Sequence, residues 1–123
     1  MNEKEMARIL GLARLAFGVV GFLAPTKTVR AWIGQEAKPY PTNMIVRGFA
    51  ARDAAIGIGL LAALENDGRV RGWIEASALS DMGDAVGTLA SWKDLPGFRR
   101  LLLLALEVGA AAAAMQLAAQ FDD

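Results

Sequence analysis

The sequence predicts an all-α fold: a four-helix transmembrane bundle with antiparallel neighbours, in a single domain over residues 1–123. Apolar residues make up 54% of the chain, whereas soluble domains typically hold about 45–50% even with glycine counted. These residues gather in four blocks of about 20 residues, the length that an α-helix needs to cross roughly 30 Å of hydrocarbon. The blocks are rich in Ala and Leu and too long for strands, so helix is the better prediction.

The first block covers residues 6–24 and is closed by Pro25, which cannot continue a helix without breaking its hydrogen bonds. After it, Val29, Trp32 and Ile33 recur at helical spacing beside basic residues. This pattern predicts a short helix that lies in the membrane interface. An ordinary amphipathic turn is the alternative interpretation of the same segment.

The second block covers residues 44–64 and follows a Pro-Thr-Asn segment, in which Thr42 or Asn43 is expected to cap the helix. Because the connections between blocks are short, neighbouring helices should run antiparallel.

Tryptophans mark the two ends of the third block, which covers residues 73–92. At about 1.5 Å per residue the block is about 28 Å long, close to the thickness of the hydrocarbon. Indoles prefer the two membrane interfaces, so Trp73 and Trp92 fit such a span. The fourth block covers residues 101–121 and is opened by Pro96.

All four blocks carry ionisable residues near their centres, where each costs about 2.5–3.5 kcal/mol on insertion scales. They are Arg14 in the first block, Arg52 and Asp53 in the second, Asp81 and Asp84 in the third, and Glu107 in the fourth. Their matching depth predicts one polar cluster inside the bundle. With two arginines against four carboxyls, either a carboxyl is protonated, or a cation or ligand supplies the balance, or water enters.

Helical spacing places these charges on faces of small residues, which let membrane helices approach closely. In the third block, Ser77, Asp81, Asp84 and Thr88 share one face. The small residues expected on packed faces are Ala7, Gly11, Gly18 and Gly21 in the first block, Gly48, Ala55 and Gly59 in the second, and Ala111, Ala114 and Ala118 in the fourth.

The predicted site is a pocket for a hydrophobic small molecule with a polar head. Arg14 and Arg52 would bind the head, or alternatively only fix helix packing through ion pairs. Asp81 or Asp84 would act as general acid or base, or alternatively only accept hydrogen bonds from the arginines. Asp53 and Glu107 would orient these groups, although a buried protonated carboxyl is an equal interpretation of Glu107.

Composition narrows the classes of function. Without Cys or His the chain lacks the usual ligands for zinc and haem, so no cofactor and no metal site is predicted. Thirteen basic residues balance thirteen acidic ones, which leaves no surplus of positive charge for nucleic acid. The expected partners are a lipid bilayer and a hydrophobic small molecule, with a homodimer or a membrane complex left open, and the expected location is the cell membrane, as a multi-pass protein.

Acid–base chemistry such as isomerisation, cyclisation or epoxide opening suits carboxyls without a cofactor. Two other functions remain open: an accessory subunit of a membrane complex, and a proton- or ion-coupled carrier. A soluble helical bundle is the structural alternative, since 21% of the residues are charged.

Two sequence motifs invite comparison with known families. The Asp-x-x-Asp motif at Asp81 and Asp84 occurs in membrane prenyltransferases and CDP-alcohol phosphotransferases, but the chain lacks their second acidic motif and is too short for either fold. Arg52-Asp53 followed by small residues up to Leu60, together with Asp81-Met-Gly-Asp-Ala, resembles small four-span bacterial membrane proteins classified as a domain of unknown function. The resemblance covers roughly residues 8–117 and implies a four-helix membrane bundle without implying an activity.

Overall fold

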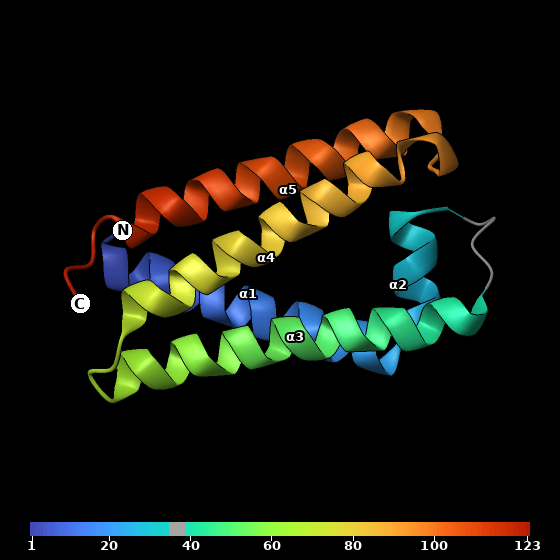
Figure 1. Cartoon of the computed structure of the whole chain (residues 1–123). Coiled ribbons are helices and arrows are strands. Elements are labelled where there is room, and N and C mark those ends of the chain that lie inside the picture. Colours follow the sequence, from blue (N-terminus) through green and yellow to red (C-terminus); the bar gives the residue numbers. More distant parts are fainter. Residues whose placement is uncertain (35–38) are drawn as a thin grey trace.

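The computed structural model describes residues 1–34 and 39–123, and every regular element in these ranges is helical. The predicted all-α class is therefore confirmed. The elements are α1 (Glu3–Leu23), α2 (Pro25–Trp32), α3 (Pro39–Glu65), α4 (Val70–Ala90), the 3₁₀ turn η1 (Trp92–Asp94) and α5 (Gly97–Ala118) (Figure 1).

Local sequence signals explain most helix boundaries. Before α1, the Asn2 side chain accepts a hydrogen bond from the Glu5 amide at 2.9 Å, and the Glu5 carboxylate accepts one from the Asn2 amide at 3.0 Å. This reciprocal capping box satisfies two amides that have no partner within the helix. Pro25 follows the end of α1 as predicted and opens α2, where a proline costs nothing because the first amide is unpaired anyway.

The start of α3 differs from the prediction. The helix begins at Pro39, so Thr42 and Asn43 lie inside it and do not cap it. Prolines are tolerated in the first turn of a helix, and the Pro-rich segment therefore starts α3 rather than preceding it. The Asn43 side chain instead donates a hydrogen bond to the Thr26 hydroxyl at 2.9 Å, which ties α3 to α2.

The four long helices form two antiparallel pairs, α1 with α3 and α4 with α5. Figure 1 shows the pairs side by side at the end that holds both termini and diverging toward the end that holds α2. At the termini, the Asp123 carboxylate accepts hydrogen bonds from the Val70 and Arg71 amides and so caps α4.

Small residues bring α1 and α3 into backbone contact. A Cβ added at Gly18 would lie 2.5 Å from the carbonyl oxygen of Ala50, and one at Gly57 would lie 2.6 Å from that of Gly11. The small-residue face predicted for α1 is therefore confirmed, and so is the buried face predicted for α5.

The small-residue face predicted for α3 is wrong at Gly48 and Ala55, which are exposed. Its third member, Gly59, is closely packed, because a Cβ there would overlap the Trp73 ring of α4. Asp53, and not its neighbour Arg52, turns toward α1 to meet Arg14. The face of α3 that packs on α1 is consequently the one that holds Asp53.

The interior changes character along the bundle. At the end near the termini it is an apolar core formed by residues such as Leu60, Ile74 and Leu117. The middle holds charged side chains, and a cavity lies toward α2. Polar groups thus occupy the inside at depths where a soluble bundle of this size normally places aliphatic side chains.

Large apolar side chains cover the outside of all four long helices, with Val20 on α1, Ile58 on α3, Leu79 on α4 and Leu106 on α5 each more than half exposed. Among the described helices, α1 and α5 are long and apolar enough to cross a membrane. The central parts of α3 and α4 carry more charge, so this test of length and composition supports two membrane spans and leaves four as a proposal.

Candidate functional site

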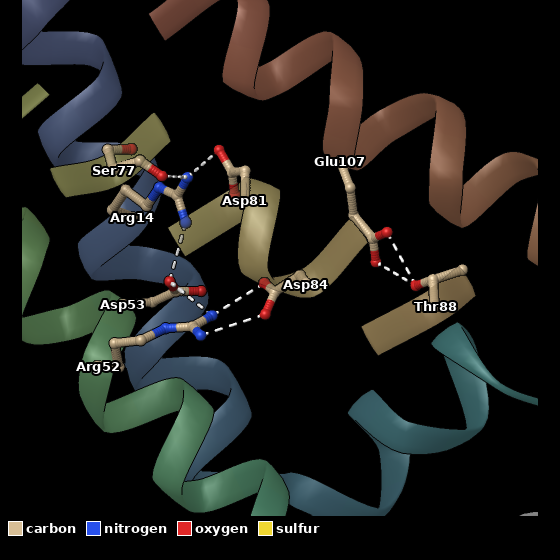
Figure 2. Close-up of polar contacts among 8 residues, drawn as sticks. All are labelled: Arg14, Arg52, Asp53, Ser77, Asp81, Asp84, Thr88 and Glu107. Carbon is tan, nitrogen blue, oxygen red and sulfur yellow. Dashed lines mark hydrogen bonds and ion pairs between the residues drawn. The ribbon is translucent and has the colours of Figure 1, made fainter. Parts of the chain in front are cut away.

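Arg14 joins three helices from the middle of α1. Its Nη1 donates a hydrogen bond to Asp53 Oδ1 on α3 at 2.9 Å. Its Nη2 donates to the carboxylate of Asp81 on α4 and lies 3.3 Å from the carbonyl oxygen of Ser77. The Arg14 guanidinium therefore contacts two carboxylates and a carbonyl, as Figure 2 shows.

A second arginine crosses from α3 to α4 one turn along the bundle. Arg52 forms a two-pronged pair with Asp84, with Nη1 to Oδ1 at 3.1 Å and Nη2 to Oδ2 at 2.9 Å. Its Nη2 also lies 3.8 Å from Asp53 Oδ1, which links the two arginines into one network. The guanidinium of Arg52 lies over the ring of Phe49, 5.2 Å from its centre, a geometry typical of cation–π contacts.

Glu107 of α5 stands apart from this network. The Thr88 hydroxyl lies 2.9 and 2.8 Å from its two carboxylate oxygens, and both residues are only 7% exposed. Within residues 1–34 and 39–123, no ion pair includes Glu107. Figure 2 shows its side chain reaching Thr88 away from both arginine pairs. The predicted single cluster is thus an Arg–Asp network of five residues and a separate Glu–Thr pair.

A cavity of about 590 Å³ lies between the diverging helix pairs, beneath α2. Its polar wall includes Arg52, Asp53, Asp84, Thr88 and Glu107. Its apolar wall includes Phe17, Val29, Trp32, Ile45, Phe49 and Leu103. Four of the six predicted site residues therefore line one cavity, together with an extensive apolar surface.

Arg14 and Asp81 are the predicted site residues that do not line the cavity. Their charged groups are engaged with each other and with Asp53 and Ser77. This geometry matches the packing interpretation of Arg14, in which ion pairs fix the positions of the helices.

The predicted short helix after the first block is α2, and its apolar side faces the cavity. Val29 is buried, and the ring of Trp32 meets that of Phe17 edge-on with 6.1 Å between their centres. At the far end of α2, the side chain of Arg99 donates a hydrogen bond to the Ala31 carbonyl, which connects α5 to this helix. The α2 helix thus forms one wall of the cavity, at the end of the bundle where the two helix pairs diverge.

Several cavity residues had no role in the sequence prediction. Thr88 lies on the predicted polar face of the third block but had no predicted role, and the sequence prediction did not include Phe17 or Phe49. Gly83 and Gly87 line the cavity one turn apart, and a Cβ at either would meet no other atom within 4 Å. Because glycine has no side chain, the two glycines near Asp84 on the same helix could have indicated from the sequence that there is open space next to the charges.

The arrangement of carboxylates, arginines and hydroxyls decides which groups the polar wall can bind. Among the residues that the structure describes, no group of three or more acidic side chains is arranged to hold a metal ion. The carboxylates of the network face arginines instead. A guest in the cavity can form hydrogen bonds with Glu107, with Thr88 and with the side of the Arg52–Asp84 pair that faces the cavity.

Comparison with protein-family models, with curated proteins and with solved structures finds no match for this chain. The resemblance to small four-span bacterial membrane proteins stays a prediction from the motifs of α3 and α4.

Proposed function

We propose that the chain is a four-span membrane protein whose cavity binds a hydrophobic small molecule with a polar head. The distribution of side chains supports the membrane part of this proposal. Large apolar residues face outward on every long helix, whereas soluble monomers rarely expose extended apolar surface. The central charges of α3 and α4, which are Arg52, Asp53, Asp81 and Asp84, point inward and are paired, which lowers their cost inside a bilayer.

The observation that carries the binding function is the cavity with one apolar and one charged wall. Its volume of about 590 Å³ falls within the range of about 300–1,000 Å³ typical of small-molecule sites. Such sites are mostly apolar and contain a few polar groups that orient the ligand. The ring of Phe17 and the carboxylate of Glu107 provide both kinds of surface.

Acid–base catalysis is the reaction class that this wall supports best. Asp84 and Glu107 both line the cavity and are our candidates for general acid and base, while Arg52 holds Asp84 in place through two hydrogen bonds. Asp81, which does not line the cavity, would act only as a packing partner of Arg14. Isomerisation, cyclisation and epoxide opening need only such proton transfers next to an apolar substrate.

Photolabelling tests whether the cavity is occupied. The probe is decanol with a diazirine in its tail, added to the protein in phosphatidylcholine nanodiscs, and labelled residues are mapped by mass spectrometry. We expect labels at Phe17, Ile45 and Phe49, and their loss in Gly87→Leu, whose new side chain fills open space in the cavity wall. The matched control is Gly109→Leu, which places the same side chain in open space outside the cavity.

Labels restricted to outward-facing residues such as Leu79, and unchanged in Gly87→Leu, would contradict the binding function. The two alternatives make other predictions. In an accessory subunit, Asp84→Asn would impair assembly alone. A proton- or ion-coupled carrier would move ions across vesicle membranes, and this flux would vanish in Asp84→Asn.

A further inference from the structure

The charge inside the bundle does not balance. Arg14 and Arg52 supply two positive charges, and both are bound to the aspartates of α3 and α4. Those aspartates already outnumber the arginines, and Glu107 adds a further carboxyl that has no cation beside it. Two carboxyls are therefore in excess: one is shared within the Arg–Asp network, where every aspartate contacts an arginine, and the other is Glu107 on α5, at the wall of the cavity.

The two arginines of α5, Arg99 and Arg100, do not contact Glu107. Arg99 donates to the Ala31 carbonyl of α2. Arg100 donates to the Trp92 carbonyl at 3.0 Å and lies over the Trp92 ring, 4.7 Å from its centre. Both guanidiniums thus have partners at the end of the bundle, beyond the carboxylate.

Glu107 also lacks hydrogen-bond donors. A carboxylate offers about four acceptor positions, and the single hydroxyl hydrogen of Thr88 is the one donor that the described residues provide. Glu107 is only 7% exposed, so bulk water solvates its carboxylate poorly. Buried carboxylates are costly unless a cation or several donors compensate them. Either a proton on the carboxyl, or a positively charged group that carries N–H donors and enters through the cavity, would compensate Glu107. Its position on the cavity wall, within reach of a guest, favours the second.

We propose that the natural ligand class of this cavity is a lipophilic ammonium, that is, a protonated amine on an apolar tail. This inference rests on the proposed binding function and names its ligand. The ammonium would donate its N–H groups to Glu107, and the tail would lie against Phe17, Val29 and Ile45. An anionic head would instead meet the Glu107 carboxylate, which has no cation beside it among the described residues.

The experiment compares three photoprobes that share one diazirine-bearing decyl tail and differ only in the head: ammonium, hydroxyl or carboxylate. Phosphatidylcholine nanodiscs carry no net surface charge, so they do not concentrate one head over another. We expect the ammonium probe to half-saturate the cavity at a concentration at least about tenfold below that of the hydroxyl probe, the effect of one charge-assisted hydrogen bond. The carboxylate probe should label the cavity least.

Two variants assign the preference to a residue. Glu107→Gln keeps an acceptor for Thr88 and should make the ammonium and hydroxyl probes equal. Glu65→Gln removes an exposed carboxyl far from the cavity, paired with Arg8, and should leave the preference intact. A preference that survives in Glu107→Gln would overturn the assignment.

The unmodified protein alone can also refute the inference. Equal half-saturation by the ammonium and hydroxyl probes would end it and leave the binding function standing. Absence of cavity labelling by all three probes would end both proposals.

Discussion

Arg14 is the residue on which the middle of the bundle depends. It binds carboxylates from α3 and α4 and a carbonyl of α4. We expect Arg14→Ala to destabilise the fold by about 3–5 kcal/mol, because it leaves buried carboxylates without a cation. Arg14→Lys should recover part of this loss, since an ammonium keeps the charge but cannot contact all partners in the same plane.

Thermal unfolding in detergent, followed by helical circular dichroism, measures the effect of Arg14→Ala. The control is Arg8→Ala on the same helix, whose exposed pair with Glu65 should contribute little. An Arg14→Ala protein that unfolds at the same temperature as Arg8→Ala would show that the network does not stabilise the bundle.

The members of the Arg–Asp network were predictable from the sequence, but their partners were not. Depth along the helix axes placed Arg14, Asp53 and Asp81 at one level. Adjacent residues on a helix point about 100° apart, so Arg52 and Asp53 face different neighbours, and only the rotation of α3 decides which one meets Arg14. Depth likewise grouped Glu107 with the network, although the rotation of α5 turns it toward Thr88.

At the scale of helices, the contact of α1 with α3 depends on glycines that no other residue can replace without movement of the backbone. A methyl group at Gly18 or Gly57 would overlap backbone atoms of the facing helix. We expect Gly18→Ala and Gly57→Ala each to cost about 1–3 kcal/mol of stability, as overpacking does elsewhere. Gly48→Ala, where a Cβ meets nothing within 4 Å, is the matched control on α3 and should be neutral or slightly stabilising.

Chemical unfolding of the three glycine variants in the same detergent compares them directly. Equal stability of Gly18→Ala and Gly48→Ala would mean that α1 and α3 are not held in backbone contact.

The sequence predicted the lengths of the long helices more accurately than it predicted the residues at which they begin. Each apolar block became one long helix, because about 20 apolar residues need an element that satisfies every backbone group internally. The start of α3 was misplaced because a proline ends one helix and begins the next with equal ease, as Pro25 and Pro39 do. The role of α2 as a wall of the cavity depends on contacts between distant segments, which hydropathy does not contain.

At the scale of the whole molecule, the cavity arises because the two helix pairs diverge around α2. No local pattern encodes that divergence. It reflects the balance between the tight α1–α3 and α4–α5 contacts and the weaker contacts across the pairs. The charged wall of the cavity was therefore predictable, while its apolar wall and its volume required the structure.

The outward surface of the whole molecule separates a membrane bundle from a soluble one. Leu79 lies near the middle of α4 and is 75% exposed. In water, Leu79→Arg should leave stability nearly unchanged and improve solubility. In a bilayer it places a charge against lipid at a cost of about 2.5–3.5 kcal/mol, in a helix that already carries Asp81 and Asp84. We therefore expect Leu79→Arg to reduce the carbonate-resistant membrane fraction of the expressed protein, whereas Arg71→Leu at the end of α4 should preserve it. Recovery of the unmodified chain in the detergent-free soluble fraction, with Leu79→Arg equally soluble and equally stable, would contradict the membrane bundle.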